Sequence, residues 1–167
     1  MPVARYYVHN PFAPQPNQPP RLGTAVVIVA DGKVLLEQRR DSFKWGIVTG
    51  DLRTTETFRQ CAIRRTVEET SIHIKDSDLH QIRMFDDPSR IVSFIEGNIY
   101  RLIHIAYYVE LDEIPETACG KQSVELRWVD MKDLLDYEMV VTHQEILEEY
   151  LQLKGSPYTC IAQPWKQ

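Results

Sequence analysis

Residues 50–72, GDLRTTETFRQCAIRRTVEETSI, constrain the fold of this chain more than any other segment. Two adjacent carboxylates, Glu68 and Glu69, stand near the end of the segment, with Arg64 before them and Glu56 further upstream. If the segment is helical, the two glutamates project close to each other from its end. Hard divalent cations bind clustered carboxylate oxygens of this kind. The segment therefore predicts a candidate metal site at the end of a long amphipathic helix.

The helix itself is predicted over residues 56–70, with Thr54 or Thr55 as its N-cap. Its modest inward stripe consists of Phe58, Cys61, Ala62 and Thr66. A pair of glutamates at a helix end is more commonly a solvated surface than a metal site. The spacing of the surrounding residues favours the metal site over that plainer interpretation.

The spacing of residues 50–72 resembles the Nudix box, G-x5-E-x7-R-E-U-x-E-E-x-G-U, in which U is a bulky aliphatic residue. The residues that fall on positions of that pattern are Gly50, Glu56, Arg64, Glu68, Glu69 and Ile72. The resemblance implies a hydrolase that cleaves the diphosphate linkage of a nucleoside diphosphate joined to another moiety. In such an enzyme Mg2+ (or Mn2+) neutralises the diphosphate and activates a water for attack on phosphorus.

The resemblance also assigns roles to the matching residues. Glu68 and Glu69 correspond to the catalytic metal ligands of the family. Glu56 and Arg64 correspond to a pair that locks the box loop onto the helix, with a salt bridge as the simplest physical account. Gly50 is expected to supply backbone freedom at that loop.

Arg65 departs from the pattern, because it stands where the family has the first glutamate of the helix. Glu68 and Glu69 lie three and four residues further on, which are the spacings at which helical side chains meet. The guanidinium is expected to pair with both carboxylates and to compete with a divalent cation for them. Arg53 stands where many family members have an acidic residue, and Ser71 replaces the late glycine. These departures from the family pattern imply a weakly bound metal and weakened activity.

Size and composition bound the class of protein. A chain of 167 residues is long enough for one domain and too short for two ordinary ones. The formal net charge of −5 argues against general binding to nucleic acid, which needs a clustered positive surface. Three widely spaced cysteines fit reduced thiols better than disulfides or zinc ligands, and no apolar run approaches the ~18 residues of a membrane span. These features predict a cytoplasmic protein with no nucleic-acid partner and no membrane span. The resemblance to the Nudix family implies a small-molecule partner, a nucleoside diphosphate derivative, and a homodimer is left open.

The chain is predicted to divide into three parts. Residues 1–23 hold six of the ten prolines and should form an extended arm. Draping over the domain is favoured for this arm over recognition by an aromatic groove of a partner. Residues 24–154 form the predicted Nudix domain, and residues 155–167 form a C-terminal tail without periodicity.

Within the domain, turn residues and alternation predict an α/β (α+β) fold. Asp31 and Gly32 between two apolar runs indicate a tight hairpin, because that turn needs positive φ. Further strands are predicted over residues 44–48, 80–85, 99–111 and 125–129. A last helix is predicted from Thr142, with Glu145 completing a capping box. This order of elements resembles the Nudix α/β/α sandwich, a mixed β-sheet between helices.

The remaining candidates for site residues are Arg39, Asp87, Arg90 and Glu125. Residues 84–92, MFDDPSRIV, resemble the loop that meets the diphosphate in sugar-nucleotide members of the family, although Asp-Pro-Ser is also a common turn. From this loop Asp87 and Arg90 are candidate substrate contacts. Arg39 ends a strand and should face phosphate or solvent. Glu125 lies where some members have an additional catalytic carboxylate, and solvated strand polarity explains it equally well.

Two hypotheses about function follow. The first is a weakly active, metal-dependent Nudix hydrolase in which Glu68 and Glu69, aided by Glu125, carry the chemistry. The second is a catalytically silent Nudix domain that binds a nucleotide-like ligand or a protein partner. Arg65 favours the second hypothesis, and the retained box residues favour the first. Metal-dependent turnover of a panel of substrates separates them.

Overall fold

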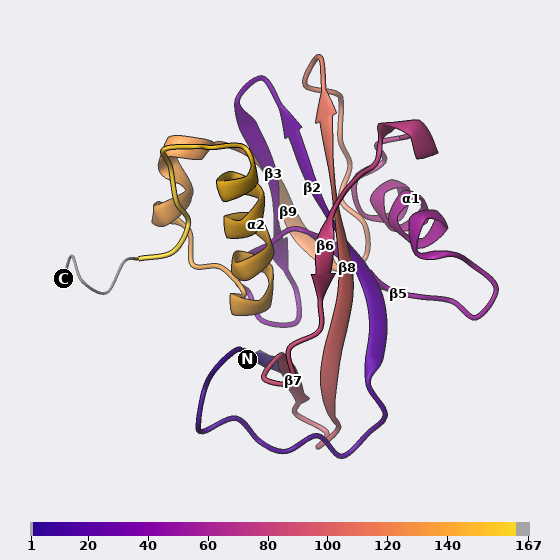
Figure 1. Ribbon diagram of the computed structural model, residues 1–167, viewed down its shortest axis with the longest axis vertical. Coiled ribbons are helices and arrows are strands. Elements are labelled where there is room, and N and C mark those ends of the chain that lie inside the picture. Colours follow the sequence, from indigo (N-terminus) through magenta and orange to yellow (C-terminus); the bar gives the residue numbers. More distant parts are fainter. Residues whose placement is uncertain (1, 163–167) are drawn as a thin grey trace.

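The computed structural model describes residues 2–162, which form a mixed β-sheet with one α-helix on each side (Figure 1). The strands are β1 (Ala4–Tyr7), β2 (Arg21–Ala30), β3 (Lys33–Arg39), β4 (Trp45–Gly46), β5 (Val48–Asp51), β6 (His80–Phe85), β7 (Ile91–Phe94), β8 (Ile99–Leu111) and β9 (Ser123–Asp130). The helices are α1 (Phe58–Thr70) and α2 (Val141–Leu153), with 3-10 turns at Asp76–Asp78 and Met131–Asp136. The predicted fold class is confirmed. Residue 1 of the arm and residues 163–167 of the tail lie outside the described part.

The sheet is mixed because one long parallel pair lies among antiparallel ones. The strands follow the order β1-β7-β8-β2-β3-β4, with β5 beside β2, β6 beside β8 and β9 beside β3. Strands β2 and β8 run parallel from Arg21 opposite Leu102 to Ala30 opposite Leu111. From Gly23 to Ala30, β2 carries only buried residues, as expected for a strand covered on both faces.

The hairpin between β2 and β3 forms where it was predicted. Asp31 and Gly32 adopt φ values of 50° and 70°, so both turn residues lie in the left-handed region. Such a turn matches the twist of the paired strands, and glycine adopts it without steric strain.

Each helix covers one face of the sheet and encloses its own apolar cluster. Ala62 of α1 packs with Val26 and Ile28, on the face toward α1. Ile146 of α2 packs with Val27, on the opposite face. The alternation along β2 therefore assigns its side chains to two separate cores. None of the described helices is both long and apolar enough to cross a membrane.

Helix α1 begins two residues later than predicted and has a different N-cap. Thr57 accepts a hydrogen bond from the Gln60 N–H at 3.1 Å, and the Gln60 side chain accepts from the Thr57 N–H at 2.9 Å. This reciprocal capping box satisfies two amide groups that the helix leaves free, so the expectation of Thr54 or Thr55 was wrong. At the other end Ser71 adopts a left-handed φ of 64°, in the place where the resemblance leads one to expect glycine.

Helix α2 also begins differently from the prediction. It starts at Val141 after Val140, and no side chain caps it. Thr142 is buried and its hydroxyl has no hydrogen-bond partner, so the predicted capping box with Glu145 is wrong. The Glu145 carboxylate instead faces Arg90, which the sequence pattern around Thr142 gave no reason to expect.

The proline-rich arm contributes a strand to the sheet. Strand β1 pairs with β7, and the N–H groups of Val3 and Ala4 donate to the Asp41 carbonyl at 2.7 and 3.0 Å. The arm then runs across the lower end of the molecule before it enters β2 at Arg21 (Figure 1). The arm is thus extended, as its prolines indicate, but strand β1 and the start of β2 already belong to the sheet.

Candidate functional site

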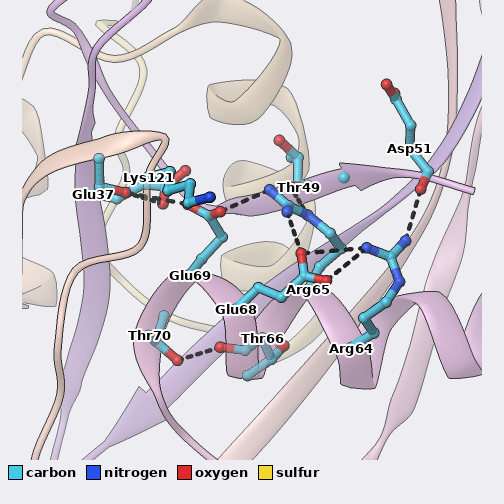
Figure 2. A network of polar contacts seen from close by, with 12 residues as sticks. Glu37, Thr49, Asp51, Arg64, Arg65, Thr66, Glu68, Glu69, Thr70 and Lys121 are labelled. Atoms are coloured by element: carbon cyan, nitrogen blue, oxygen red, sulfur yellow. Dashed lines mark hydrogen bonds and ion pairs between the residues drawn. The ribbon is translucent and has the colours of Figure 1, made fainter.

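Arg65 lies at the centre of the candidate site and points along α1 toward both box glutamates (Figure 2). Its Nη1 donates to Glu68 Oε2 at 2.7 Å, and its Nη2 donates to Glu69 Oε1 at 2.9 Å. Its Nε donates to the Thr49 carbonyl at 3.2 Å. The predicted pairing of Arg65 with both carboxylates is confirmed. The guanidinium therefore ties α1 to β5 and neutralises the carboxylates that a metal ion would need.

Gly50 lies directly beneath this guanidinium. A Cβ added at Gly50 would overlap the Nε, Cδ and Cγ atoms of Arg65. Gly50 sits within strand β5, and its φ is not positive. The expected role of backbone freedom is thus corrected: the position needs glycine because the Arg65 side chain passes where a side chain would be.

Arg64 makes a second set of ion pairs on the same helix. Its Nη2 donates to Glu56 Oε1 at 2.6 Å and its Nε donates to Glu56 Oε2 at 2.9 Å. The predicted salt bridge between these two residues is confirmed. The hydrogen bonds from Arg64 lower the pKa of Glu56 to about 2. Arg64 Nη2 also donates to the Asp51 carbonyl at 2.9 Å. The bidentate ion pair and this bond therefore hold the loop before the helix in place.

Glu68 is shared among several arginines. Arg64 Nη1 donates to Glu68 Oε1 at 3.0 Å, in addition to the bond from Arg65, and Arg53 Nη2 lies 3.7 Å from the same oxygen. Burial raises the pKa of Glu68, but the hydrogen bonds from Arg64 and then Arg65 outweigh it, so the net shift is downward. The carboxylate is thus held ionised by cations that the chain itself supplies.

Glu69 continues the network into the protein interior. Ser123 Oγ lies 3.4 Å from Glu69 Oε2 and donates to Glu37 Oε2 at 2.7 Å. Glu37 is buried, which raises its pKa, and Arg39 Nη1 donates to its other oxygen at 3.2 Å. Sequence reasoning missed Glu37 and Ser123. One indication was available: Glu37 follows the apolar Leu35 by two residues, so strand alternation places it on the same buried face.

The described side chains do not fit a divalent cation at this place. Both glutamates of the box already accept hydrogen bonds from Arg65, and Glu68 accepts another from Arg64. Hard cations need several free carboxylate or carbonyl oxygens around one point. Among residues 2–162, no group of three or more Asp, Glu, His or Cys side chains converges in a way that could hold a metal ion.

A cavity of about 630 Å³ adjoins this network and carries more arginines than carboxylates. The arginines that line it are Arg21, Arg39, Arg53, Arg64 and Arg65, and the carboxylates are Asp41, Asp51 and Glu68. Two buried histidines, His104 and His143, also line it. Burial lowers the pKa of His104 to about 3 and that of His143 well below its ordinary value, so both rings are neutral. The charge of the lining therefore favours an anionic ligand.

Arg39 is the predicted substrate contact that the structure places at the cavity. Its guanidinium forms a fork with Asp41, through Nη2 to Oδ2 at 2.9 Å and Nε to Oδ1 at 3.1 Å. Nη1 also lies 3.4 Å from Thr49 Oγ1. Burial lowers the pKa of Arg39, but the nearby Tyr6, Asp41 and Glu37 raise it by more than burial lowers it. The net shift of the pKa is upward, so the guanidinium is cationic. Arg39 thus forms part of the cavity wall with most of its donors engaged.

Asp87 and Arg90 do not line this cavity. The Asp87 carboxylate accepts from the Ser89 N–H at 2.9 Å in an exposed turn, as the plainer interpretation of Asp-Pro-Ser has it. The Arg90 guanidinium is fully buried and pairs with Glu145 at 3.0 Å. Its other partners are the carbonyls of Phe85, Leu102 and Thr142, and His104 Nδ1. The expected substrate contact of Arg90 is therefore corrected to a structural role, because its donors bind β6, β8 and α2.

Glu125 lies apart from the other candidate catalytic residues. Glu125 on β9 lies opposite Gln38 on β3. Because neighbouring residues of a strand point to opposite faces, Gln38 and Glu125 project from the face opposite to that of Glu37. Both of its oxygens accept from Arg127 Nη2 at 2.8 Å, and the Arg127 guanidinium stacks on Trp45 at 4.8 Å. The structure thus places Glu125 in a half-exposed ion pair on the α2 side of the sheet, which agrees with the solvated strand polarity that the sequence left open beside a catalytic contribution.

The comparisons with known proteins agree with this architecture. The family model described as the NUDIX domain matches residues 19–150. The search of curated proteins gave no match. Among solved structures, a MutT/nudix family protein from Enterococcus faecalis is similar to this chain, with a TM-score of 0.67 and 19% identity. That similarity covers 84% of this chain and 64% of the other, which is less than two thirds of its length.

Two further solved structures are similar to this chain. One is the NUDIX domain of Shewanella oneidensis NrtR complexed with ADP ribose, with a TM-score of 0.65, 18% identity and coverage of 87% and 94%. The other is a bifunctional NMN adenylyltransferase/ADP ribose pyrophosphatase from Francisella tularensis, complexed with AMP and Mn ion. It has a TM-score of 0.65 and 21% identity, and the similarity covers 87% of this chain but 43% of that one. At these identities the likeness concerns the fold.

Proposed function

This chain belongs to the NUDIX domain family, and we propose that it binds a nucleoside diphosphate linked to another moiety without hydrolysing it efficiently. The observation that carries this proposal is the pairing of Arg65 with Glu68 and Glu69. A positive charge stands where the family resemblance leads one to expect a metal-binding carboxylate. The cation of the site is then a guanidinium of the chain and not a divalent metal.

The nature of the ligand is supported by the charge of the cavity and by the similar structures. A lining with more guanidinium groups than carboxylates favours phosphate oxygens, which arginine forks bind in a bidentate manner. The Shewanella oneidensis domain is complexed with ADP ribose, and the Francisella tularensis protein with AMP. A cavity of about 630 Å³ is within the range of sites for ligands of this size.

The weak hydrolysis follows from the electrostatics of the same residues. Replacing a carboxylate by a guanidinium changes the local charge by two units. At 4 Å and an effective dielectric constant of 20, two unit charges interact with about 4 kcal/mol. A repulsion on this scale lowers the affinity for Mg2+ or Mn2+ by about two orders of magnitude or more, and the activated water depends on that metal.

A metal-dependent Nudix hydrolase is the second candidate. It is favoured by the lock between Arg64 and Glu56, which holds the loop as an active box would require. In this case Glu68 and Glu69 would hold the divalent ion, and the Arg65 guanidinium would have to leave both carboxylates. The two candidates differ in whether ligand binding needs the metal.

Calorimetry and product analysis with ADP-ribose distinguish the candidates. We expect binding to the wild-type protein in EDTA, and slow or absent release of AMP after Mg2+ or Mn2+ is added. Rapid metal-dependent release of AMP, together with binding that EDTA abolishes, would establish the hydrolase instead. If ADP-ribose binds under neither condition, a panel of other nucleoside diphosphate derivatives that also fails to bind would overturn the proposal.

A further inference from the structure

Two arginines of the cavity, Arg21 and Arg53, differ from the others because, in the described part of the chain, no short hydrogen bond to a carboxylate holds their guanidinium groups. Arg39, Arg64 and Arg65 are each held by at least two short bonds to carboxylates. Arg53 lies 3.7 Å from its nearest carboxylate, Glu68, which is longer than a hydrogen bond, and its side chain is 63% exposed. Within residues 2–162, Arg21 forms no ion pair with a carboxylate.

Two aromatic rings, and not a carboxylate, position the Arg21 side chain. Its Cζ lies 4.1 Å from the centroid of the Tyr100 ring and 5.0 Å from that of Phe94. Stacking on the ring faces positions the guanidinium plane and leaves the N–H groups at its edge free to donate. The group is therefore pre-positioned and its donors are available to a ligand.

The sheet brings the backbone positions of these two arginines close together at the cavity. Gly23 pairs with Asp51 at the end of the β2–β5 ladder, and the Leu52 N–H donates to the Leu22 carbonyl at 2.8 Å. Arg21 precedes Leu22 on β2 and Arg53 follows Leu52 after β5, so the two arginines flank that contact, and both line the cavity. The side chains come from a rigid strand start and from the loop that follows β5.

We infer that Arg21 and Arg53 form a clamp that binds the diphosphate of the ligand directly, without a bridging metal ion. Two planar forks from neighbouring backbone positions can each bind one of two linked phosphate groups. Val92, Phe94 and Leu102 form an apolar wall of the same cavity for the less polar part of the ligand. The clamp rests on the proposed function of the cavity, and it assigns the phosphate contacts to the two lining arginines that are not held by short bonds to carboxylates of the described residues.

The test measures binding of ADP and of inorganic diphosphate in EDTA by calorimetry. We expect Arg21→Gln and Arg53→Gln each to weaken both probes by about tenfold or more, since a charge-assisted hydrogen bond is lost. Arg83→Gln is the matched control. Arg83 stacks on Phe85 at 3.8 Å and pairs with Glu149 at 3.4 Å, but it does not line the cavity. Its removal takes away the same charge and should change affinity by less than about twofold, because distant charges are screened.

The outcomes separate the clamp from the proposed function. If the wild-type protein binds neither these probes nor any other nucleoside diphosphate derivative, both are overturned. If it binds them and the two variants bind equally well, the clamp is wrong and the proposed function stands. A loss for ADP but not for inorganic diphosphate, or an equal loss in Arg83→Gln, also overturns the clamp. Thermal unfolding checks that each variant is folded. Arg21→Lys keeps the charge but lacks the planar fork, so this milder change should still weaken the binding of both probes.

Discussion

Arg65 and Glu69, one helical turn apart on α1, form an ion pair of 2.9 Å in which the glutamate side chain is 3% exposed. A carboxylate removed from water to this extent needs a partner, because an isolated buried charge is strongly unfavourable. The chain supplies that partner from within the same helix. A second box glutamate, Glu68, is neutralised in the same way at 2.7 Å. The site is thus complete as an internal salt-bridge network before any ligand arrives.

The first prediction concerns metal affinity. Arg65→Glu should bind Mn2+ or Mg2+ more tightly than the wild-type protein and should raise any pyrophosphohydrolase rate. The substitution removes the competing cation and adds a third carboxylate next to Glu68 and Glu69. The metal-free variant should be less stable, because three carboxylates then repel one another without a counter-charge. Calorimetric titration with Mn2+ measures the affinity.

Arg65→Gln serves as the control for this substitution. It removes the positive charge without adding a ligand, so its metal affinity should fall between those of the wild-type protein and Arg65→Glu. Equal affinity in all three proteins would mean that Arg65 does not compete with metal. In that case the pairing with Glu68 and Glu69 would be a structural feature without influence on the chemistry.

The second prediction concerns Arg90. Arg90→Ala should lower the free energy of unfolding by about 3–5 kcal/mol, because it leaves Glu145 without its partner and three carbonyl oxygens without their donor. Urea denaturation measures the change. The control Arg83→Ala removes a half-exposed ion pair to Glu149 and should cost about 1 kcal/mol or less. A stability loss no larger than that of the control would show that Arg90 is dispensable to the fold.

These cases illustrate which parts of the molecule can be predicted from the sequence. The hairpin at Asp31 and Gly32, strand β8 and the contacts of Arg65 with its glutamates are all local. They depend on turn geometry, on a run of apolar residues and on spacing along one helix. Each involves residues close together in the chain, where a pattern is sufficient to indicate the contact.

The features that were missed depend on contacts between distant residues. Arg90 meets Glu145 across 55 positions, and Ser123 meets Glu37 across 86. Both pairs form only once the sheet and helices are packed, so no local pattern marks them. The start of α1 was misplaced because Thr54, Thr55 and Thr57 all have the chemistry of a cap, and the structure uses Thr57. Helix α2 begins without a side-chain cap, because Thr142 is buried within the fold.

The third prediction concerns acid stability and follows from the lowered pKa of Glu56. Hydrogen bonds from Arg64 bring this pKa from an ordinary value of 4.5 to about 2. A carboxyl whose pKa is depressed on folding contributes stability that is present above the unfolded pKa. That contribution is lost as the pH falls from about 4.5 toward 2. Thermal unfolding across this pH window should therefore show a declining Tm.

The variant Glu56→Gln isolates this contribution. It should be less stable than the wild-type protein at neutral pH, where the wild-type carboxylate is ionised and paired with Arg64. The two Tm curves should converge as the pH falls toward 2, because protonation removes the same charge that the substitution removes. Parallel curves across the window would show that other carboxyls dominate the acid sensitivity.

The last prediction concerns the space that Gly50 leaves for Arg65. In Gly50→Ala the new methyl group would overlap the Nε, Cδ and Cγ atoms of Arg65, so the guanidinium must leave its position over β5. The substitution should destabilise the protein by about 1–3 kcal/mol, the usual range for overpacking. In an Arg65→Ala background the methyl group meets no such side chain, and the same substitution should be nearly neutral. A double-mutant cycle by urea denaturation measures the coupling, which should lie within about 0.5–3 kcal/mol and favour the double variant.

An equal loss of stability in both backgrounds would mean that the methyl group is excluded by the sheet itself. Glycine would then be required at this position for a reason unrelated to Arg65.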